Sequence, residues 1–451
     1  MKNDLTRGSV TGTMISFAVP MILGDILQQC YNIADTVIVG MFLGADALAA
    51  VGSAFSLMTF LTSIILGLAM GSGTVFSIRF GQRDDKGLKE GIRASFALLG
   101  AVTIMLNILI YAGLGLIIRL LRTPAELAGL MEEYLAVIFS GMIGIFLYNF
   151  FASLLRSLGN SVIPLVFLAV SACLNIVLDL WFVAGLDRGV AGAAEATVIS
   201  QYVSGIGIAI YTRVRFPELI KRDKGIKLRL SRVREITNFS ALTCLQQSIM
   251  NLGILAVQGL VNSYGTAVMA AFAAAVKIDA FAYLPVQDFG NAFSIFVAQN
   301  SGAKKTERIK KGIRSAFAVS MAFGLLISVC VFALARPLMT LFIDAGETAV
   351  IAEGVRYLRI EGAFYFMIAA LFLLYGLYRA LGKPGMSVVL TIVSLGLRVL
   401  LAYSLSAVPA FGVVGIWWSV PMGWFLADAF GIGYYFIKRR KLIGEKSVSG
   451  L

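Results

Sequence analysis

Two acidic residues stand in stretches of the sequence that are otherwise apolar, and each has polar neighbours at helical spacing. Asp179 ends the segment LNIVLD, in which Asn175 lies four residues earlier. Asp35 lies in QQCYNIADTVIVG, four residues after Tyr31 and seven after Gln28. Residues four apart share one face of an α-helix. The spacing therefore predicts a polar face around each acid.

The chemistry that such acids can perform is the reversible binding of a small cation. An ionised acid in hydrocarbon costs roughly 2.5–3.5 kcal/mol on insertion scales, so we expect Asp35 and Asp179 to point into the protein. Two carboxylates in one dry pocket repel each other, so the pair can take up a proton near neutral pH or hold Na+. Asn175, Thr197 and Asn149 supply neutral oxygens in other apolar stretches, which suits a hard cation. The alternative is a polar network that only ties helices together.

Other charged residues also lie in apolar stretches. Lys277 and Asp279 are two residues apart, so they do not face each other on a helix. They either contact a substrate or pair with charges on other helices. Three more intramembrane charges have no spacing that assigns them a role: Asp25, Arg398 and Asp428.

The composition predicts the elements that position these residues. The chain has 451 residues, of which 59% are hydrophobic and 14% charged, with a mean hydropathy of +0.86. Soluble domains are about 45–50% apolar and about 25% charged. A helix of about 20 apolar residues spans the hydrocarbon. The sequence therefore predicts an all-α polytopic membrane protein with twelve transmembrane helices, at 14–41, 47–78, 94–118, 134–155, 162–184, 190–212, 236–262, 267–298, 315–335, 356–378, 386–408 and 412–437.

The net charge of +13 is explained by its placement. Of the 38 Lys and Arg residues, 30 lie in alternate gaps between the predicted helices, on one side of the membrane. The positive-inside rule then predicts that both termini are cytoplasmic. The basic excess reports topology, and we expect no nucleic-acid partner.

The reactive residue types are few. The chain has no His, and its four Cys residues all fall inside predicted spans. Haem, zinc and Ser-His-Asp chemistry mostly need imidazole. We therefore expect neither an enzyme nor a cofactor beyond a coupling ion, and no disulfide.

The chain contains an internal repeat. GIRASFA (91–97) recurs as GIRSAFA (312–318), and RSLGN (156–160) recurs as RALGK (379–383), at an offset of 221–223 residues. Because six helices bring the chain back to its starting side of the membrane, the second half has the same orientation as the first. Two-lobed secondary transporters are built in this way. The predicted organisation, from the N-terminus, is a lobe of six helices (1–212), a basic cytoplasmic linker (213–235) and a second lobe of six helices (236–451).

The repeat also bears on the two acids. At an offset of 223, Asn175 matches Arg398 and Asp179 matches Ala402. The scaffold tolerates an apolar residue at the second place, so folding alone does not require a carboxylate there. The carboxylate of Asp179 is therefore an additional feature of the first half that its repeat does not share.

Together these motifs resemble a known family. FAVPMILGDILQQCYNIADTVIVGMFLGADALAAVG, then RSLGN and LNIVLD, then FVAQNSGA are similar to the multidrug and toxic compound extrusion (MATE) family, in its DNA-damage-inducible protein F-like branch. The resemblance covers nearly the whole chain. It implies two pseudo-symmetric six-helix bundles and export of organic, often cationic, drugs across the plasma (inner) membrane. The export is in exchange for H+ or Na+, and relatives work as single chains.

The resemblance also implies roles for residues. It assigns ion or proton coupling to Asp35, Asn175, Asp179 and Thr197, and a bend of the first helix to Pro20. Leu180 is a departure, because many relatives carry proline after the acid. Acids used in the second lobe by another branch have Glu361 as their nearest match. The candidate substrate-cavity residues are Gln28, Tyr31, Asn149, Lys277, Asp279 and Glu361.

A lipid-linked oligosaccharide flippase of the same wider superfamily is the alternative function. Such a protein would need a broader basic cavity. The intramembrane cations here are few, namely Lys277 and Arg398. The cation pattern therefore favours the exporter.

Overall fold

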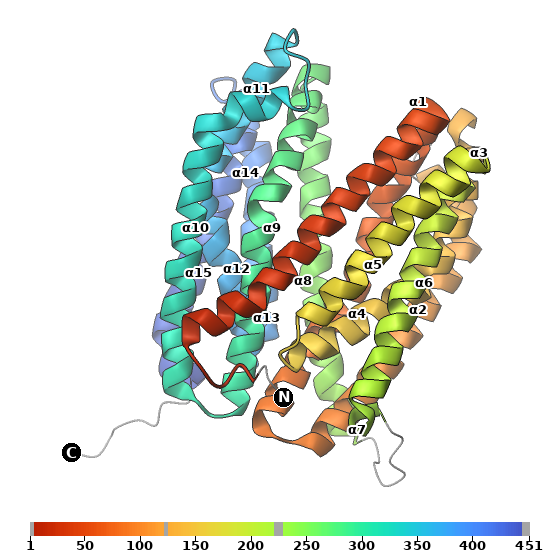
Figure 1. Cartoon of the computed structure of the whole chain (residues 1–451). Coiled ribbons are helices and arrows are strands. Elements are labelled where there is room, and N and C mark those ends of the chain that lie inside the picture. Colours follow the sequence, from red (N-terminus) through yellow and green to blue (C-terminus); the bar gives the residue numbers. More distant parts are fainter. Residues whose placement is uncertain (1–3, 121–124, 221–228, 444–451) are drawn as a thin grey trace. The chain divides into compact units, whose positions relative to one another are not determined.

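The computed structural model describes residues 4–120, 125–220 and 229–443, and every regular element in these ranges is helical. Figure 1 labels the helices. Their bounds are α1 (Val10–Gln82), α2 (Asp85–Leu120), α3 (Ala125–Ile138), η1 (Phe139–Gly141), α4 (Met142–Ser157), α5 (Val162–Asp179), η2 (Leu180–Gly185), α6 (Gly189–Arg215), α7 (Pro217–Ile220), α8 (Leu230–Asn262), α9 (Thr266–Gly302), α10 (Thr306–Thr340), α11 (Thr348–Gly362), α12 (Tyr365–Ala380), α13 (Pro384–Thr391), η3 (Ile392–Gly396), α14 (Leu397–Ser406) and α15 (Gly412–Ile443).

The number of spanning segments agrees with the predicted all-α polytopic fold. Within the described ranges, eleven helices are long and apolar enough to cross a membrane. A twelfth crossing is made if α11 and α12, which are bent by 51° at a short break, form one span. The predicted spans 14–41 and 47–78 both lie in α1, on either side of Gly44. The backbone of Gly44 is non-helical, with φ 84° and ψ −174°, a conformation that glycine adopts without steric cost.

The chain divides into two compact units. The first unit contains Leu23–Cys244, and the second contains Leu5–Ile22 and Leu245–Leu451. Two short segments thus group differently from the predicted lobes. Leu5–Ile22 packs with the second half of the chain, and the start of α8 packs with the first half. Part of the predicted linker, 221–228, lies outside the described residues.

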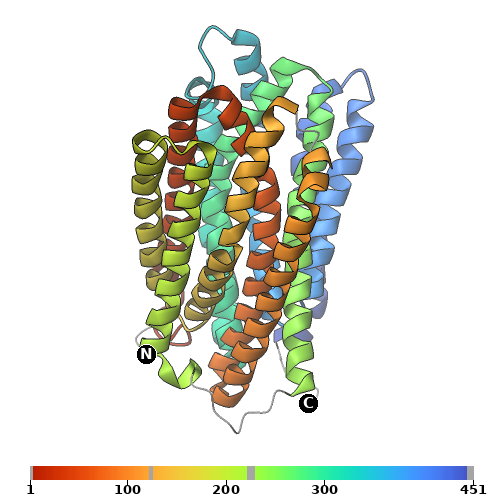
Figure 2. The ribbon, with the colours of Figure 1, turned by 90° about the vertical axis from the view of Figure 1, so that its right-hand side faces the viewer.

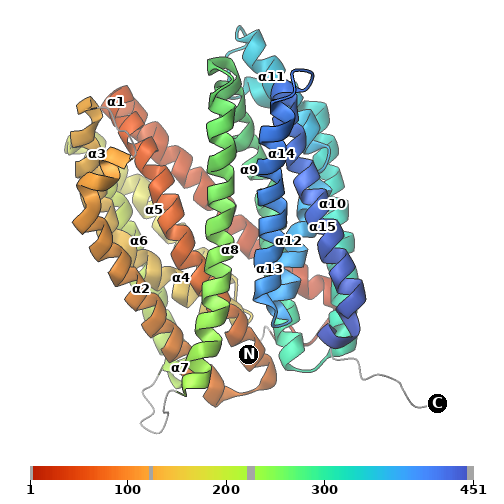
Figure 3. The ribbon, with the colours of Figure 1, turned by 180° about the vertical axis from the view of Figure 1, so that it is seen from behind.

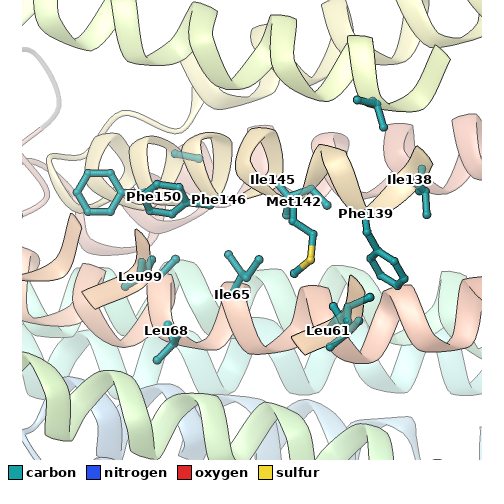
Figure 4. Packing of buried hydrophobic residues seen from close by; sticks show 14 of the residues in the cluster. Leu61, Ile65, Leu68, Leu99, Ile138, Phe139, Met142, Ile145, Phe146 and Phe150 are labelled. Carbon is teal, nitrogen blue, oxygen red and sulfur yellow. The ribbon is translucent and has the colours of Figure 1, made fainter. Parts of the chain in front are cut away.

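The first unit is a helical bundle. Helix α6 packs against α3, α4 and α5, and these helices run side by side in both views (Figures 1 and 2). Apolar side chains spaced three or four residues apart form one face of each helix and meet in the core. Figure 4 labels ten of them: Leu61, Ile65, Leu68, Leu99, Ile138, Phe139, Met142, Ile145, Phe146 and Phe150.

Small residues let α1 and α8 approach closely inside the first unit. A Cβ at Gly71 would lie 2.5 Å from the carbonyl oxygen of Phe239. Beside this contact, the hydroxyls of Ser72 and Ser240 are 2.8 Å apart, and Ser95 donates a hydrogen bond of 2.5 Å to Ser72. Glycine and serine are common where membrane helices pack, because they allow close backbones and hydroxyl bonds.

The second unit is built around α9 and α15. Helix α9 packs against α10, α11 and α12, while α15 packs against α11, α12 and α14 (Figure 3). Its core is aromatic near one end. Trp417 meets Tyr357 edge to face at 4.9 Å between centroids and stacks on Phe272 at 5.6 Å.

An N-terminal segment is anchored in the second unit. Arg308 on α10 donates hydrogen bonds to the carbonyl oxygens of Arg7 (2.7 Å) and Gly8 (2.6 Å). Lys305 donates to the carbonyl oxygen of Thr6 at 2.7 Å. Charged donors on backbone carbonyls make strong hydrogen bonds, so these side chains explain why the segment groups with the second half.

Candidate functional site

The first unit brings together the two acids that the sequence singled out. Asp35 lies on α1 and Asp179 is the last residue of α5. The two carboxyl groups interact electrostatically with each other. Two ionised carboxylates repel each other. The arrangement therefore favours a proton on one of them or a cation between them.

The oxygens at this site lack partners. Asn175 and Asp179 are 2% and 0% exposed. Both carboxylate oxygens of Asp179, one oxygen of Asp35 and the amide oxygen of Asn175 are buried without a hydrogen bond. The Asn175 amide nitrogen donates to the Thr197 hydroxyl at 3.2 Å, which leaves the amide oxygen available as an acceptor.

The oxygen atoms of this site suit particular kinds of cation. Within the described ranges, no Lys or Arg forms an ion pair with either acid. Buried polar groups nearly always have partners, and each exception calls for an explanation such as an unseen ion. Carboxylate, amide and hydroxyl oxygens fit a proton or a hard cation such as Na+. The part of the chain that the structure describes has no group of three or more Cys, Asp or Glu residues placed to hold a metal ion.

Two tyrosines accompany the acids. Tyr31, one turn before Asp35 on α1, interacts electrostatically with Asp35 and Asp179. Tyr134, on α3 and 7% exposed, interacts with the same two acids and with Tyr31. A tyrosine hydroxyl can donate a hydrogen bond to a carboxylate or accept one. The sequence reasoning missed Tyr134, because no polar residue at helical spacing marks it.

The backbone changes immediately after Asp179. Residues Leu180–Gly185 form a π-helix, a rare geometry that is frequent at functional sites. Phe182 in this turn packs with Leu178 and Ala196, so apolar side chains flank the acid. The departure at Leu180 from the proline of many relatives thus falls on a turn of irregular helix.

Two further candidates are not brought into this cluster. Asn149 on α4 donates its amide to the carbonyl oxygen of Ile145, at 2.9 Å within its own helix. Gln28 is exposed, and no hydrogen bond of its side chain occurs within the described ranges. A role for either in a substrate cavity stays a prediction.

Pro20 lies inside α1, and the helix continues through it. Proline removes one backbone hydrogen bond of a helix and favours a kink. The chain passes from the second unit to the first at Ile22 and Leu23, two residues after the proline. The weakened turn therefore coincides with the division between the units.

A second buried acid cluster lies in the second unit. Asp279 on α9 is 3% exposed. It accepts a hydrogen bond of 2.7 Å from the Tyr357 hydroxyl and a second, short one from the Tyr365 hydroxyl. Its two oxygens are thus both occupied.

Glu361 and Arg398 complete this second cluster. Glu361 on α11 is 6% exposed, and Arg398 on α14 attracts both Glu361 and Asp279. Lys277 is exposed, so it lies on another face of α9 from Asp279, as the spacing predicted. No ion pair of Lys277 occurs within the described ranges.

The two clusters therefore differ in how their charges are balanced. In the second unit a buried arginine attracts both acids and two tyrosines donate to Asp279, while one oxygen of Glu361 has no hydrogen bond among the described residues. The acids of the first unit have unpartnered oxygens and no neighbouring cationic side chain within the described residues. Asp35 and Asp179 consequently form the better candidate for binding a cation from solution.

Known proteins resemble this chain along its whole length. The MatE family model matches residues 20–181 and 243–404, two ranges that begin 223 residues apart, as the repeat requires. The probable multidrug resistance protein YpnP of Bacillus subtilis is 30% identical over 454 residues, covering 98% of this chain and 99% of that protein. The probable multidrug resistance protein YoeA of the same organism is 28% identical over 451 residues, covering 97% and 96%.

The fold also matches a solved structure. A multidrug resistance MATE family transporter in an outward-facing conformation gives a TM-score of 0.92 at 23% identity, with 98% of each chain covered. At this identity the match reports the fold alone. It agrees with the expected fold of two repeated helical halves.

Proposed function

The chain belongs to the MatE family, and on that premise we propose that it is a secondary antiporter that exports organic, often cationic, compounds in exchange for H+ or Na+. The family and the two Bacillus relatives support multidrug efflux. The observation that carries the exchange is the set of unpartnered oxygens at Asp35 and Asp179.

In the proposed mechanism, the coupling cation occupies the two acids and neutralises their mutual repulsion. Asn175 contributes its amide oxygen, because Thr197 accepts from its nitrogen. A ligand shifts a conformational equilibrium only by its differential affinity for the two states. Occupied and empty acids therefore favour different members of an outward-open and inward-open pair, and substrate leaves while the cavity faces outward.

The setting of this activity is part of the proposal. The protein works as a monomer in the plasma (inner) membrane with both termini in the cytoplasm. The charge bias supports this orientation, because Lys and Arg accumulate in cytoplasmic loops.

The test is transport by purified protein in vesicles. Asp179→Asn keeps the shape of the side chain and removes its charge. We expect ethidium transport driven by an imposed pH gradient or Na+ gradient to fall by at least tenfold in this variant. Running the two gradients separately on the unsubstituted protein identifies the coupling ion.

A matched control comes from the same unit. Glu195 on α6 is ion-paired with Arg188 at 2.7 Å and lies two residues from Thr197. Glu195→Gln removes a carboxylate that already has a partner, so gradient-driven transport should persist. Undiminished transport by Asp179→Asn would refute the assignment of the coupling site.

A further inference from the structure

A cavity of about 560 Å3 lies in the second unit, and Asp279, Glu361 and Arg398 are not among the residues that line it. Its lining residues lie on α12, which is called the floor, and on α10 and α15, which both pack against α12. The Thr306 hydroxyl at the start of α10 donates to the carbonyl oxygen of Ile443 at the end of α15, at 3.3 Å. The cavity is therefore a groove lined by three helices, two of which are joined at one end.

The groove has a basic end and an apolar interior. On α10 its lining residues include Lys310, Arg314 and Phe317, which recur every three or four residues and so form one helix face. On α15 the lining face includes Phe436 and Arg439. The cations lie in the first turns of α10 and the last turns of α15, so they gather at the same end of the groove.

The depth of the groove suits a lipid. Lys310 and Phe317 are seven residues apart, as are Arg439 and Ile432, which spans about 10 Å at 1.5 Å per residue. One leaflet contributes about 15 Å of hydrocarbon. A molecule with its charge at the basic end would therefore place an apolar tail along Leu374 and Leu377, which line the floor and are buried.

We propose that this groove binds one anionic phospholipid, with its phosphate at Lys310, Arg314 and Arg439 and one acyl chain along the floor. Glu307 pairs with Lys310 at 2.9 Å but is largely exposed, so the basic end keeps an excess of positive charge. Anionic lipids concentrate in the cytoplasmic leaflet, and basic pockets between helices on that side bind their head groups. The choice of leaflet rests on the proposed orientation; the binding itself does not.

The experiment is native mass spectrometry of the full-length protein in detergent. The added probes are palmitoyl-oleoyl phosphatidylglycerol, phosphatidylcholine with the same chains, and inorganic phosphate. We expect phosphatidylglycerol to be retained in preference to phosphatidylcholine, with phosphate failing to displace it. Arg314→Gln combined with Arg439→Gln should weaken phosphatidylglycerol retention by about tenfold, because basic side chains supply the attraction.

The matched control is Lys311→Gln combined with Arg440→Gln. These two exposed cations are each close in sequence to a groove cation but do not line the groove, so retention should be unchanged. Ile432→Trp tests the apolar part, since it fills the groove from an exposed position and should lower retention with every cation in place. Equal losses in the charge variant and its control, equal retention of phosphatidylcholine, or displacement by phosphate would each overturn the proposal. None of these outcomes depends on transport.

Discussion

Replacing an acid by its amide should have opposite consequences for stability in the two clusters. Asp279 accepts hydrogen bonds from Tyr357 and Tyr365. Hydrogen bonds to charged groups contribute roughly 1.5–3 kcal/mol and neutral ones roughly 0.5–1.5 kcal/mol. Asp279→Asn therefore loses about 1 kcal/mol per bond, or about 2 kcal/mol of unfolding free energy in total. Asp179 has no hydrogen bond to lose, so Asp179→Asn should leave stability unchanged or raise it.

The assay is equilibrium unfolding in mixed micelles with increasing sodium dodecyl sulfate, followed by tryptophan emission. Trp417 and Trp424 are buried in the second unit, which contains Asp279, and Trp181 lies two residues after Asp179 in the first, so the emission reports on both units. The measurement is made at pH 7 without Na+, because a cation that binds only the folded protein would add stability. Adding Na+ afterwards should stabilise the unsubstituted protein and not Asp179→Asn if Na+ is the coupling ion.

Tyr357→Phe is a second probe of the same reasoning. It removes one hydrogen bond to the Asp279 carboxylate, worth roughly 1.5–3 kcal/mol, without changing any charge, so the loss should be comparable to that for Asp279→Asn. The reasoning fails if Asp179→Asn is destabilised as much as Asp279→Asn, because the acids of the first unit would then have stabilising partners.

Two further predictions concern packing and the N-terminal anchor. Gly71→Ala places a Cβ within 2.6 Å of the Ser240 Cα. Overpacking costs roughly 1–3 kcal/mol, so the thermal midpoint of the purified protein should fall. At Gly113 a Cβ meets nothing within 4 Å, so Gly113→Ala should not lower the midpoint. Arg308→Gln removes charged donors to the N-terminal segment, so proteolysis near the N-terminus should accelerate; the exposed Lys304→Gln serves as control, and equal cleavage rates in both variants would contradict the anchoring role.

The sequence predicted those parts of the fold that depend on local pattern. Apolar segment length located the spanning helices, and the backbone break at Gly44 falls between the predicted spans 14–41 and 47–78. The internal repeat appears again in the two ranges matched by one family model. The break between α11 and α12 was not predicted, because residues 356–378 were assigned to a single span.

The sequence predicted the site residues that share one helix and missed those that come from other helices. Asn175 and Asp179 share a face of α5 and follow from spacing alone. Tyr134 comes from a third helix, and only packing in three dimensions brings it to the acids. The grouping of Leu5–Ile22 with the second half depends on side chains about 300 residues away, which no local pattern reveals.

The buried Arg398 of the second unit bears on how the two repeated halves of the chain differ in function. Asn175 and Arg398 occupy equivalent places in the two copies, but a guanidinium tethered to the backbone cannot be carried across a membrane. In the proposed mechanism the first copy takes its positive charge from solution, whereas the second carries Arg398 permanently. Under that proposal only the first copy couples to an ion gradient, and the two repeated halves have different roles.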